Sequence, residues 1–199
     1  MIRITHTALI VVMFVTSLAI AARADMYKGY ETPRYEVVDA SGDFELRRTL
    51  PHLVAEVSVA GDREGAIGRG FRVLADYIFG GNATGEKIAM TSPVTQLPAA
   101  TGKDIWTVRF MMPESYDRDR LPAPKTEAVR FVETRPETHL VIRFSGRWQD
   151  GNLSGHEADL RAEAARRGLS ITGGPIYHFY DGPFTLPWNR RNEIAVIVG

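Results

Sequence analysis

The sequence predicts a domain of the α+β class, in which two similar strand–helix–strand halves form an antiparallel sheet covered by two helices. Short segments that alternate apolar and polar residues, such as Leu53–Val59, are typical of half-buried strands. Two longer segments, which begin near Asp62 and Ser154, have the spacing of amphipathic helices. The triplet His52–Val54 recurs as His139–Val141, and a helix and then a strand are expected after each copy. This echo predicts an internal repeat within one domain.

Length and composition fit one compact domain of ordinary solubility. The chain has 199 residues, of which 44% are hydrophobic and 24% are charged, and its formal net charge is zero. It contains no basic run, so nucleic acid is not expected as a partner. The absence of cysteine excludes disulfides, thiolate metal sites, a cysteine nucleophile and covalent cofactor attachment through a CxxCH motif.

Residues 1–24 have the pattern of a secretory signal peptide. Arg3 precedes an apolar run from Ala8 to Ala22, and Ala22 and Ala24 are the small residues that a signal peptidase reads. An uncleaved anchor helix is the alternative, but the run is short for crossing about 30 Å of hydrocarbon. We therefore expect cleavage after Ala24, no stable membrane span afterwards, and a periplasmic or secreted protein.

A polar lead at residues 25–34 is expected before the first half of the domain, about residues 35–112. A hairpin is predicted around Gly42, because a turn sequence separates two strand-like segments there. A polar, proline-rich connection follows at residues 114–125. The strands expected in this half are Tyr35–Val38, Phe44–Arg47, Leu53–Val59, Lys87–Gln96 and Trp106–Met112.

The first helix has a clear start and end in the sequence. Asp62 is a good N-cap, and Gly80 supplies the residue that ends a helix cheaply. Gly68 lies inside the helix, where glycine costs up to about 1 kcal/mol relative to alanine. The missing side chains leave a bare flank for a flat ligand, or they allow close packing on the sheet. The apolar stripe of the helix comprises Ile67, Phe71, Leu74, Ala75 and Ile78.

The second half, about residues 126–199, repeats this plan. Its helix is predicted to open with a capping box at Ser154–Glu157 and to end at Gly168. Strands are expected at Ile176–Tyr180 and Glu193–Val198. Ion pairs at i,i+4 spacing are predicted for Glu157–Arg161 and Glu163–Arg167 on the exposed side. The buried side of the helix is predicted to comprise Ala158, Ala162, Ala165 and Leu169.

Motifs that carry chemistry elsewhere are incomplete in this chain. The segment GGNATGEK departs from a phosphate loop, because Glu86 separates the last glycine from the lysine. The histidines after residue 24 are scattered without zinc-ligand spacing, so no metal site is expected. No serine lies in a GxSxG elbow. The residues therefore predict a binding domain rather than an enzyme.

Four blocks of the sequence resemble the SOUL haem-binding protein family. They are YEVVDASGDFELRRTLPHLVAEV, GFRVLADYIFGGNATGEKIAMTSPVTQ, VRFMMPESYDRDRLPAPKTEAVRFVE and WNRRNEIAVIV, and the similarity runs from about Tyr35 to the C-terminus. The resemblance implies a pseudo-twofold fold, in which a twisted antiparallel β-sheet curves like an open barrel and two long α-helices flank it. It also implies non-covalent binding of haem b or a free porphyrin.

The resemblance places the expected cleft between the first helix and the loop Gly182–Arg191. From the helix it implies Phe71, Leu74, Ala75 and Ile78. From the loop, Phe184, Leu186 and Trp188 would cover a flat apolar ring.

The two arginines at the end of that loop have two interpretations. Arg190 or Arg191 would bind the propionates of the ring by charge-assisted hydrogen bonds. The alternative is a structural ion pair with Glu193 or with other acidic residues.

The sequence departs from the family at one position that matters for iron. Some members are thought to use a histidine at the position of Arg48 as an axial ligand, and an arginine does not ligate iron. His52 is a substitute by proximity alone, and a structural histidine is the more common role at such a position. Binding through apolar contact, without an axial ligand, is therefore expected.

The function predicted from the sequence is a carrier, buffer or scavenger of haem or another tetrapyrrole outside the cytoplasm. One rival is a binding module for a different amphipathic small molecule. Another is an enzyme that acts on the tetrapyrrole, for example by removing iron.

Overall fold

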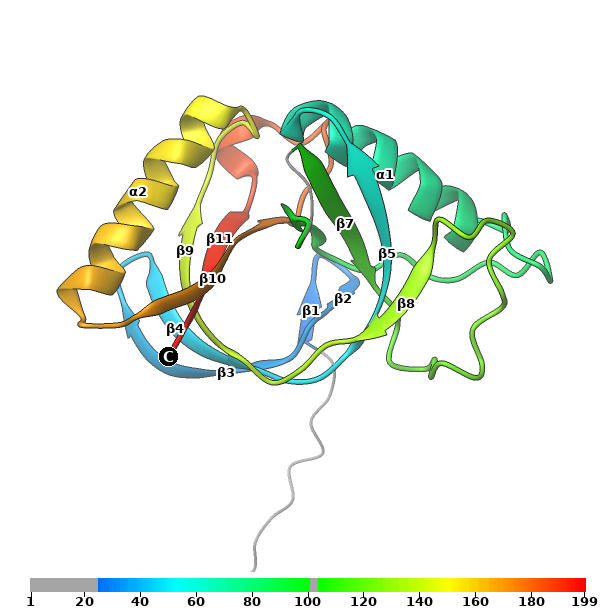
Figure 1. The fold of residues 1–199 in the computed structure, drawn as a ribbon, viewed down its shortest axis with the longest axis horizontal. Coiled ribbons are helices and arrows are strands. Elements are labelled where there is room, and N and C mark those ends of the chain that lie inside the picture. Colours follow the sequence, from blue (N-terminus) through cyan, green and yellow to red (C-terminus); the bar gives the residue numbers. More distant parts are fainter. Residues whose placement is uncertain (1–24, 101–103) are drawn as a thin grey trace, which may run out of the picture.

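A computed structural model describes residues 25–100 and 104–199. The predicted signal peptide, residues 1–24, lies outside the described residues. Within those ranges, a nine-stranded antiparallel sheet curves into an open barrel, and α1 (Arg63–Ile78) and α2 (Asp150–Arg166) lie on its outer side (Figure 1). The strands of this sheet are β3 (Tyr35–Ser41), β4 (Phe44–Thr49), β5 (Leu53–Ala60), β6 (Val94–Pro98), β7 (Ile105–Met111), β8 (Arg130–Glu133), β9 (Thr138–Phe144), β10 (Ile171–Phe179) and β11 (Asn192–Val198).

The strand order follows from the internal repeat. The order is β3-β4-β9-β11-β10-β6-β7-β5-β8. Without β3, the remaining strands form equivalent pairs about the centre of the sheet: β4 with β8, β9 with β5, β11 with β7, and β10 with β6. The triplets His52–Val54 and His139–Val141 therefore stand at the beginning of equivalent strands, β5 and β9. The predicted fold class, with its pseudo-twofold repeat, is confirmed.

The two halves are interlocked rather than side by side. Strand β4 of the first half pairs with β9 of the second, and β8 of the second half pairs with β5 of the first. Each half therefore depends on a strand of the other half for its backbone hydrogen bonds, and the two halves form one domain.

Most of the core lies between the sheet and the helices, in one cluster under each helix. A third, smaller cluster comprises Val141, Ile176 and Ala195. Under α1, Val57 and Val108 are opposite each other in the β5–β7 ladder and pack with Leu74. Under α2, Leu140 and Leu160 belong to the second cluster. Because side chains alternate along a strand, the residues between these core positions point to the inner, concave face of the sheet.

The helical glycines divide between the two interpretations given by the sequence. A Cβ added to Gly70 would lie 2.5 Å from a methyl group of Val108, so this glycine allows α1 to approach β7 closely. A Cβ added to Gly68 would meet only a nitrogen of Arg72, at 4.0 Å. Gly70 therefore serves packing, whereas Gly68 leaves a bare flank on the helix.

The predicted boundaries of α1 are confirmed. The Asp62 carboxylate accepts a hydrogen bond from the N–H of Gly65 at 2.6 Å, and the helix ends at Ile78. Gly80 then adopts a φ of +109°, a left-handed conformation that favours glycine.

The predicted start of α2 is wrong. Of the predicted buried face only Leu169, just after the helix, packs on the core, where it is partly buried. The helix begins at Asp150, and Ser154 bonds within it to the carbonyl of Gly151 instead of capping it. A polar residue followed three positions later by an acidic one is also common inside exposed helices, and this helix has few large apolar residues to fix its face. The predicted ion pairs are confirmed, at 2.8 Å for Glu157–Arg161 and 2.6 Å for Glu163–Arg167. Ala158, Ala162 and Ala165 are exposed, whereas Leu153, Leu160 and Ala164 are buried.

Two other segments differ from expectation. The strand predicted at Lys87–Gln96 begins only at Val94, because the preceding backbone bonds elsewhere: the N–H of Ile88 donates to the Ile78 carbonyl and that of Ser92 to the Glu31 carbonyl. The polar lead contains a small hairpin, β1 (Asp25–Tyr27) and β2 (Tyr30–Thr32). Of the helices in the described ranges, none has an apolar stretch of the length needed to cross a bilayer.

Candidate ligand-binding groove

An apolar groove of about 420 Å³ lies between α1 and the chain that follows β10. Helix α1 contributes one wall, the segment before β6 contributes the floor, and Pro183 and its neighbours contribute the opposite wall. Tyr30, from the N-terminal hairpin, closes one end. The apolar side chains of the groove are Tyr30, Ile67, Phe71, Met90, Val94, Trp148, Phe179, Tyr180 and Pro183.

Phe71 is the residue of the predicted helix set that lines this groove. Its ring contacts Phe110 edge to face, with centroids 5.3 Å apart, and the side chain remains 37% exposed. One face of the ring is therefore fixed by the core, and the other is available to a ligand. Gly68 lies one turn before it and leaves the wall flat.

The other predicted helix residues do not form the groove wall. Leu74 and Ile78 are fully buried under the sheet, and Ala75 is buried beside them. The apolar stripe as a whole packs on β5 and β7, so only its edge faces the groove. That edge consists of Ile67, Gly68, Phe71 and Arg72.

Arg72 is a groove residue that the sequence did not single out. It makes no hydrogen bond or ion pair with any described residue, and it stands beside Phe71 on the exposed edge of α1. The available signal was its position four residues after Gly68, on the same edge of the helix.

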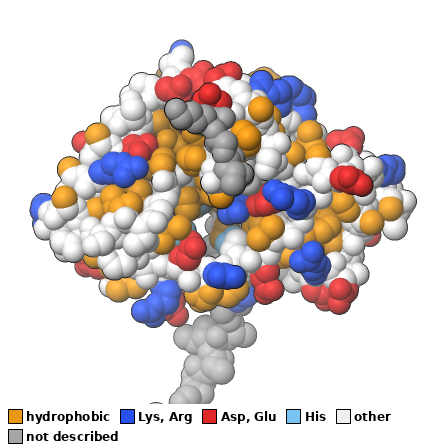
Figure 2. Space-filling view, in the orientation of Figure 1, with side chains coloured by type: hydrophobic (Ala, Val, Ile, Leu, Met, Phe, Trp, Pro, Cys, Tyr) orange, Lys and Arg blue, Asp and Glu red, His pale blue; other side chains and the backbone are white. Residues whose placement is uncertain are grey.

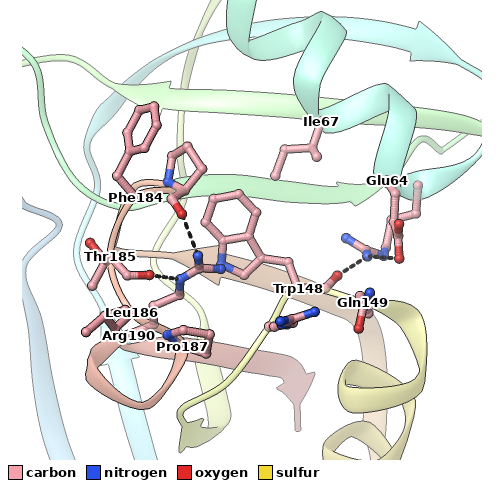
Figure 3. Close-up of a pocket in the computed structure, with 12 residues that line it drawn as sticks. Glu64, Ile67, Trp148, Gln149, Phe184, Thr185, Leu186, Pro187 and Arg190 are labelled. Carbon is pink, nitrogen blue, oxygen red and sulfur yellow. Dashed lines mark hydrogen bonds and ion pairs between the residues drawn. The ribbon is translucent and has the colours of Figure 1, made fainter.

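Arg190 holds its own loop together. Its guanidinium donates to the carbonyls of Thr185 and Pro183, both at 2.7 Å, and lies 4.8 Å from the centre of the Trp148 ring. Figure 3 shows the Trp148 indole beside this loop and Ile67 of α1 on the other side of the hollow. Arg190 therefore fixes the shape of the wall.

The three apolar loop residues are exposed but do not line the groove. Phe184, which is 99% exposed, and Leu186 border a neighbouring hollow of about 490 Å³ (Figure 3). That hollow adjoins the groove, because both contain Ile67, Trp148 and Pro183. The predicted residue Trp188, in the short helix η1 (Pro187–Asn189), lies on another side beside Asn189.

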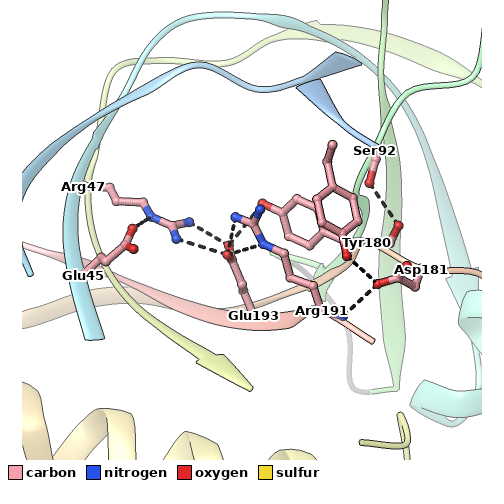
Figure 4. A network of polar contacts seen from close by, with 8 residues as sticks. Glu45, Arg47, Ser92, Tyr180, Asp181, Arg191 and Glu193 are labelled. Atoms are coloured by element: carbon pink, nitrogen blue, oxygen red, sulfur yellow. Dashed lines mark hydrogen bonds and ion pairs between the residues drawn. The ribbon is translucent and has the colours of Figure 1, made fainter. Parts of the chain in front are cut away.

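Arg191 belongs to a buried ionic network instead of the groove. It pairs with Glu193 at 2.6 Å and stacks on Tyr180, with its guanidinium carbon 4.0 Å from the ring centre (Figure 4). Arg47 binds the same carboxylate at 2.6 Å. Burial alone would raise the pKa of Glu193, but the two guanidinium groups outweigh it and lower the pKa to about 2. The structural alternative for Arg191 is confirmed.

The N-terminal hairpin is tied to the groove by Asp181. The Tyr27 hydroxyl donates to this carboxylate at 2.9 Å and Lys28 at 2.5 Å. The N–H of Arg191 also donates to it, at 2.7 Å (Figure 4). Tyr30 is thereby positioned at the end of the groove.

Neither Arg48, which takes the place of the family's ligating histidine, nor His52 lies at the groove. Arg48 is exposed on β4 and pairs with Glu36 at 3.4 Å. His52 precedes β5 and lies, like Val54, on the concave face of the sheet, opposite to α1. Among the described residues that line the groove, there is no histidine. The proposed substitute ligand is therefore on the wrong side of the sheet.

The family model for the SOUL heme-binding protein matches residues 30–197. The chain belongs to this family. The human protein Heme-binding protein 2 is 27% identical over 184 residues, which cover 89% of this chain and 88% of the human protein. The mouse protein of the same name is 26% identical over 163 residues, or 78% of each chain.

Solved structures with a similar fold are more distant in sequence. The C-terminal domain of EcmrR superposes with a TM-score of 0.62 at 13% identity, covering 83% of this chain and 98% of that domain. A hydrolase from Listeria innocua gives a TM-score of 0.53 at 12% identity, covering 79% and 92%. At such identities the likeness concerns the fold alone.

Proposed function

We propose that this protein binds haem or a related tetrapyrrole non-covalently in the groove beside α1, and that it acts outside the cytoplasm as a carrier, buffer or scavenger. The observation that carries this proposal is the groove itself, which combines aromatic and aliphatic walls with the bare flank at Gly68. Membership of the SOUL family supports the ligand class.

The groove suits a flat, largely apolar molecule with acidic substituents. Apolar burial at about 25 cal/mol per Å² supplies several kcal/mol, which leaves roughly micromolar affinity after the cost of association. Arg72, which has no partner among the described residues, replaces the predicted Arg190 and Arg191 as the cation for a propionate.

Because no described residue of the groove is a histidine, haemin and metal-free protoporphyrin should bind with similar affinity. Absorbance titration of both compounds tests this. Phe71→Asp, which places a charge on the groove wall, should weaken both by at least tenfold. Phe79→Asp is the matched control, since Phe79 is exposed just after the same helix and does not line the groove.

The outcomes separate the alternatives. An equal loss of affinity with both variants would mean that a charge anywhere near α1 weakens binding, which contradicts a specific site. If neither haemin nor protoporphyrin binds, the proposal is wrong, and a different amphipathic molecule becomes the candidate ligand of the groove.

The location outside the cytoplasm rests on the N-terminal sequence pattern. Mass analysis of the exported protein should find Asp25 as its first residue. A soluble extracytoplasmic protein that retains Met1 would contradict cleavage at this place.

A further inference from the structure

A second cavity, of about 310 Å³, lies on the concave face of the sheet. It holds on the order of ten water molecules by volume, so it suits a compact molecule rather than a tetrapyrrole. Figure 2 shows a hollow near the centre of this view, with histidine surface inside it and charged groups at its edge. This cavity goes beyond the function proposed for the groove. Tyr180 lines both spaces, but the other residues of the cavity differ from those of the groove.

The walls of the cavity are partly apolar. Val54 and Met111 come from one side of the barrel, and Val141 and Ile176 come from the other. A ligand with an apolar body would bury its surface against both halves of the repeat.

The charges of the cavity decide which polar group fits. The carboxylate of Glu193 is already bound by Arg47 and Arg191, so it offers no unpaired negative charge to a cation. Arg109 is different, because only its Nε is engaged, by Glu56 at 2.8 Å. Its two Nη groups have no partner among the described residues. Such a free guanidinium fork matches the two oxygens of a carboxylate.

His52 adds a second group beside Arg109. Its Nδ1 lies 3.0 Å from the carbonyl of Leu50, which only accepts, so Nδ1 carries the hydrogen. Thr134 supports this tautomer, because its hydroxyl donates to the His52 carbonyl and its oxygen faces Nδ1 at 3.1 Å. Nε2 therefore keeps its lone pair and has no partner among the described residues. It is free to take up a proton.

Other titratable groups share the cavity with His52. The charged groups and histidines that line it from the strands are Arg109 on β7, His139 on β9, His178 on β10, Arg47 on β4 and Glu193 on β11. Tyr35 on β3 and Tyr180 on β10 complete the walls, while Arg34, Glu133, Arg135 and Glu137 stand at the rim. Burial lowers the pKa of His52, and the charges of Arg109 and His139 add to this, although the bond to Leu50 opposes it. The ring is therefore neutral in the empty cavity at pH 7.

We propose that this cavity binds a small organic carboxylate with an apolar body, held by the Arg109 fork and by His52. The charge of Arg109 is already paired with Glu56, so a bound carboxylate adds a negative charge beside His52. His52 then takes a proton from solvent and donates it through Nε2. The proton returns to solvent when the ligand leaves. Affinity therefore rises as the pH falls.

The probe for this proposal is benzoate, with benzamidine as a ring of similar size and opposite charge. Imidazole nitrogen NMR shifts of the wild-type protein should move toward the imidazolium form at His52 when benzoate is added at about pH 7. Benzoate should bind at least tenfold more tightly than benzamidine, and more tightly at about pH 5.5 than at about pH 8. Failure of benzoate to bind, or equal binding of benzamidine, would overturn the proposal.

Variants locate the site without relying on a single substitution. Arg109→Gln and His52→Ala should each weaken benzoate binding by at least tenfold, while His156→Ala on α2 should leave it unchanged. Benzoate binding that survives both cavity variants would contradict the assignment. The NMR titration uses the wild-type protein, so it tests the proposal even if Arg109→Gln does not fold.

Discussion

Replacement of Gly68 by leucine separates ligand binding from stability in the proposed groove. A Cβ at this position meets only the Arg72 side chain at 4.0 Å, and Gly68 lines the open groove, so we expect a leucine side chain to extend into the groove. Leucine in a helix interior is favoured over glycine by about 0.8 kcal/mol, so the free energy of unfolding should rise. The side chain would nevertheless occupy the flat wall. If it separates a ring from about 60 Å² of apolar surface, the loss at about 25 cal/mol per Å² is about 1.5 kcal/mol, or roughly tenfold in affinity.

Two assays on the same variant test this reasoning. Urea unfolding measures stability, and absorbance titration with haemin measures binding. Gly155→Leu is the matched control, because Gly155 lies in α2 with open space around it, so the change should stabilise the protein without altering haemin affinity. Wild-type haemin affinity in a stable Gly68→Leu protein would refute the placement of the ligand.

Further predictions concern packing, acid stability and iron. Gly70→Ala should destabilise the protein by about 1–3 kcal/mol in urea unfolding, because the new methyl group would overlap Val108; equal or greater stability would contradict the close approach of α1 and β7. Glu193 has a pKa of about 2 against an ordinary 4.5, so its ionised form contributes about 3 kcal/mol that is fully present above pH 4.5 and lost as the pH falls toward 2. Arg47→Met should reduce stability at pH 7 and flatten that acid dependence; an unchanged profile would show that the pair does not set it. His52→Ala should leave haemin affinity and the Soret band unchanged, whereas a shifted band would return His52 to the role of iron ligand.

The sequence predicts the fold class and most of its elements, because the signals for them are local and repeated. The Asp62 cap, the Gly80 stop and the alternation of β5 each specify an element, and the His52–Val54 echo arranges the elements in pairs. The α2 face was misassigned because alanines at several positions give no large apolar side chain to fix the stripe. Leu153 and Leu160, which are the true anchors, were the better guide.

The site is harder to predict from the sequence, because the apolar stripe of a helix does not show which of its residues the sheet will cover. Leu74 and Ile78 have the right chemistry for a ligand, yet the sheet buries them completely. Tyr30 and Met90 reach the groove only through the tertiary fold, from segments with no helical or strand periodicity that would connect them to α1. The choice between a ligand-binding and a structural role for Arg191 depends on its ion pair with Glu193, and no spacing rule shows that Glu193 is buried.

The most direct test of the central claim is to map the contact surface of a bound ring in solution. Titration of the isotope-labelled protein with metal-free, diamagnetic protoporphyrin, followed through amide NMR shifts, reports each contact without interference from iron. We expect the largest shifts at Ile67–Arg72, at residues 90–94 and at residues 181–183, with little change around Arg109 and His52 on the concave face. Shifts concentrated in the concave cavity, or no shifts at the α1 edge, would contradict the account.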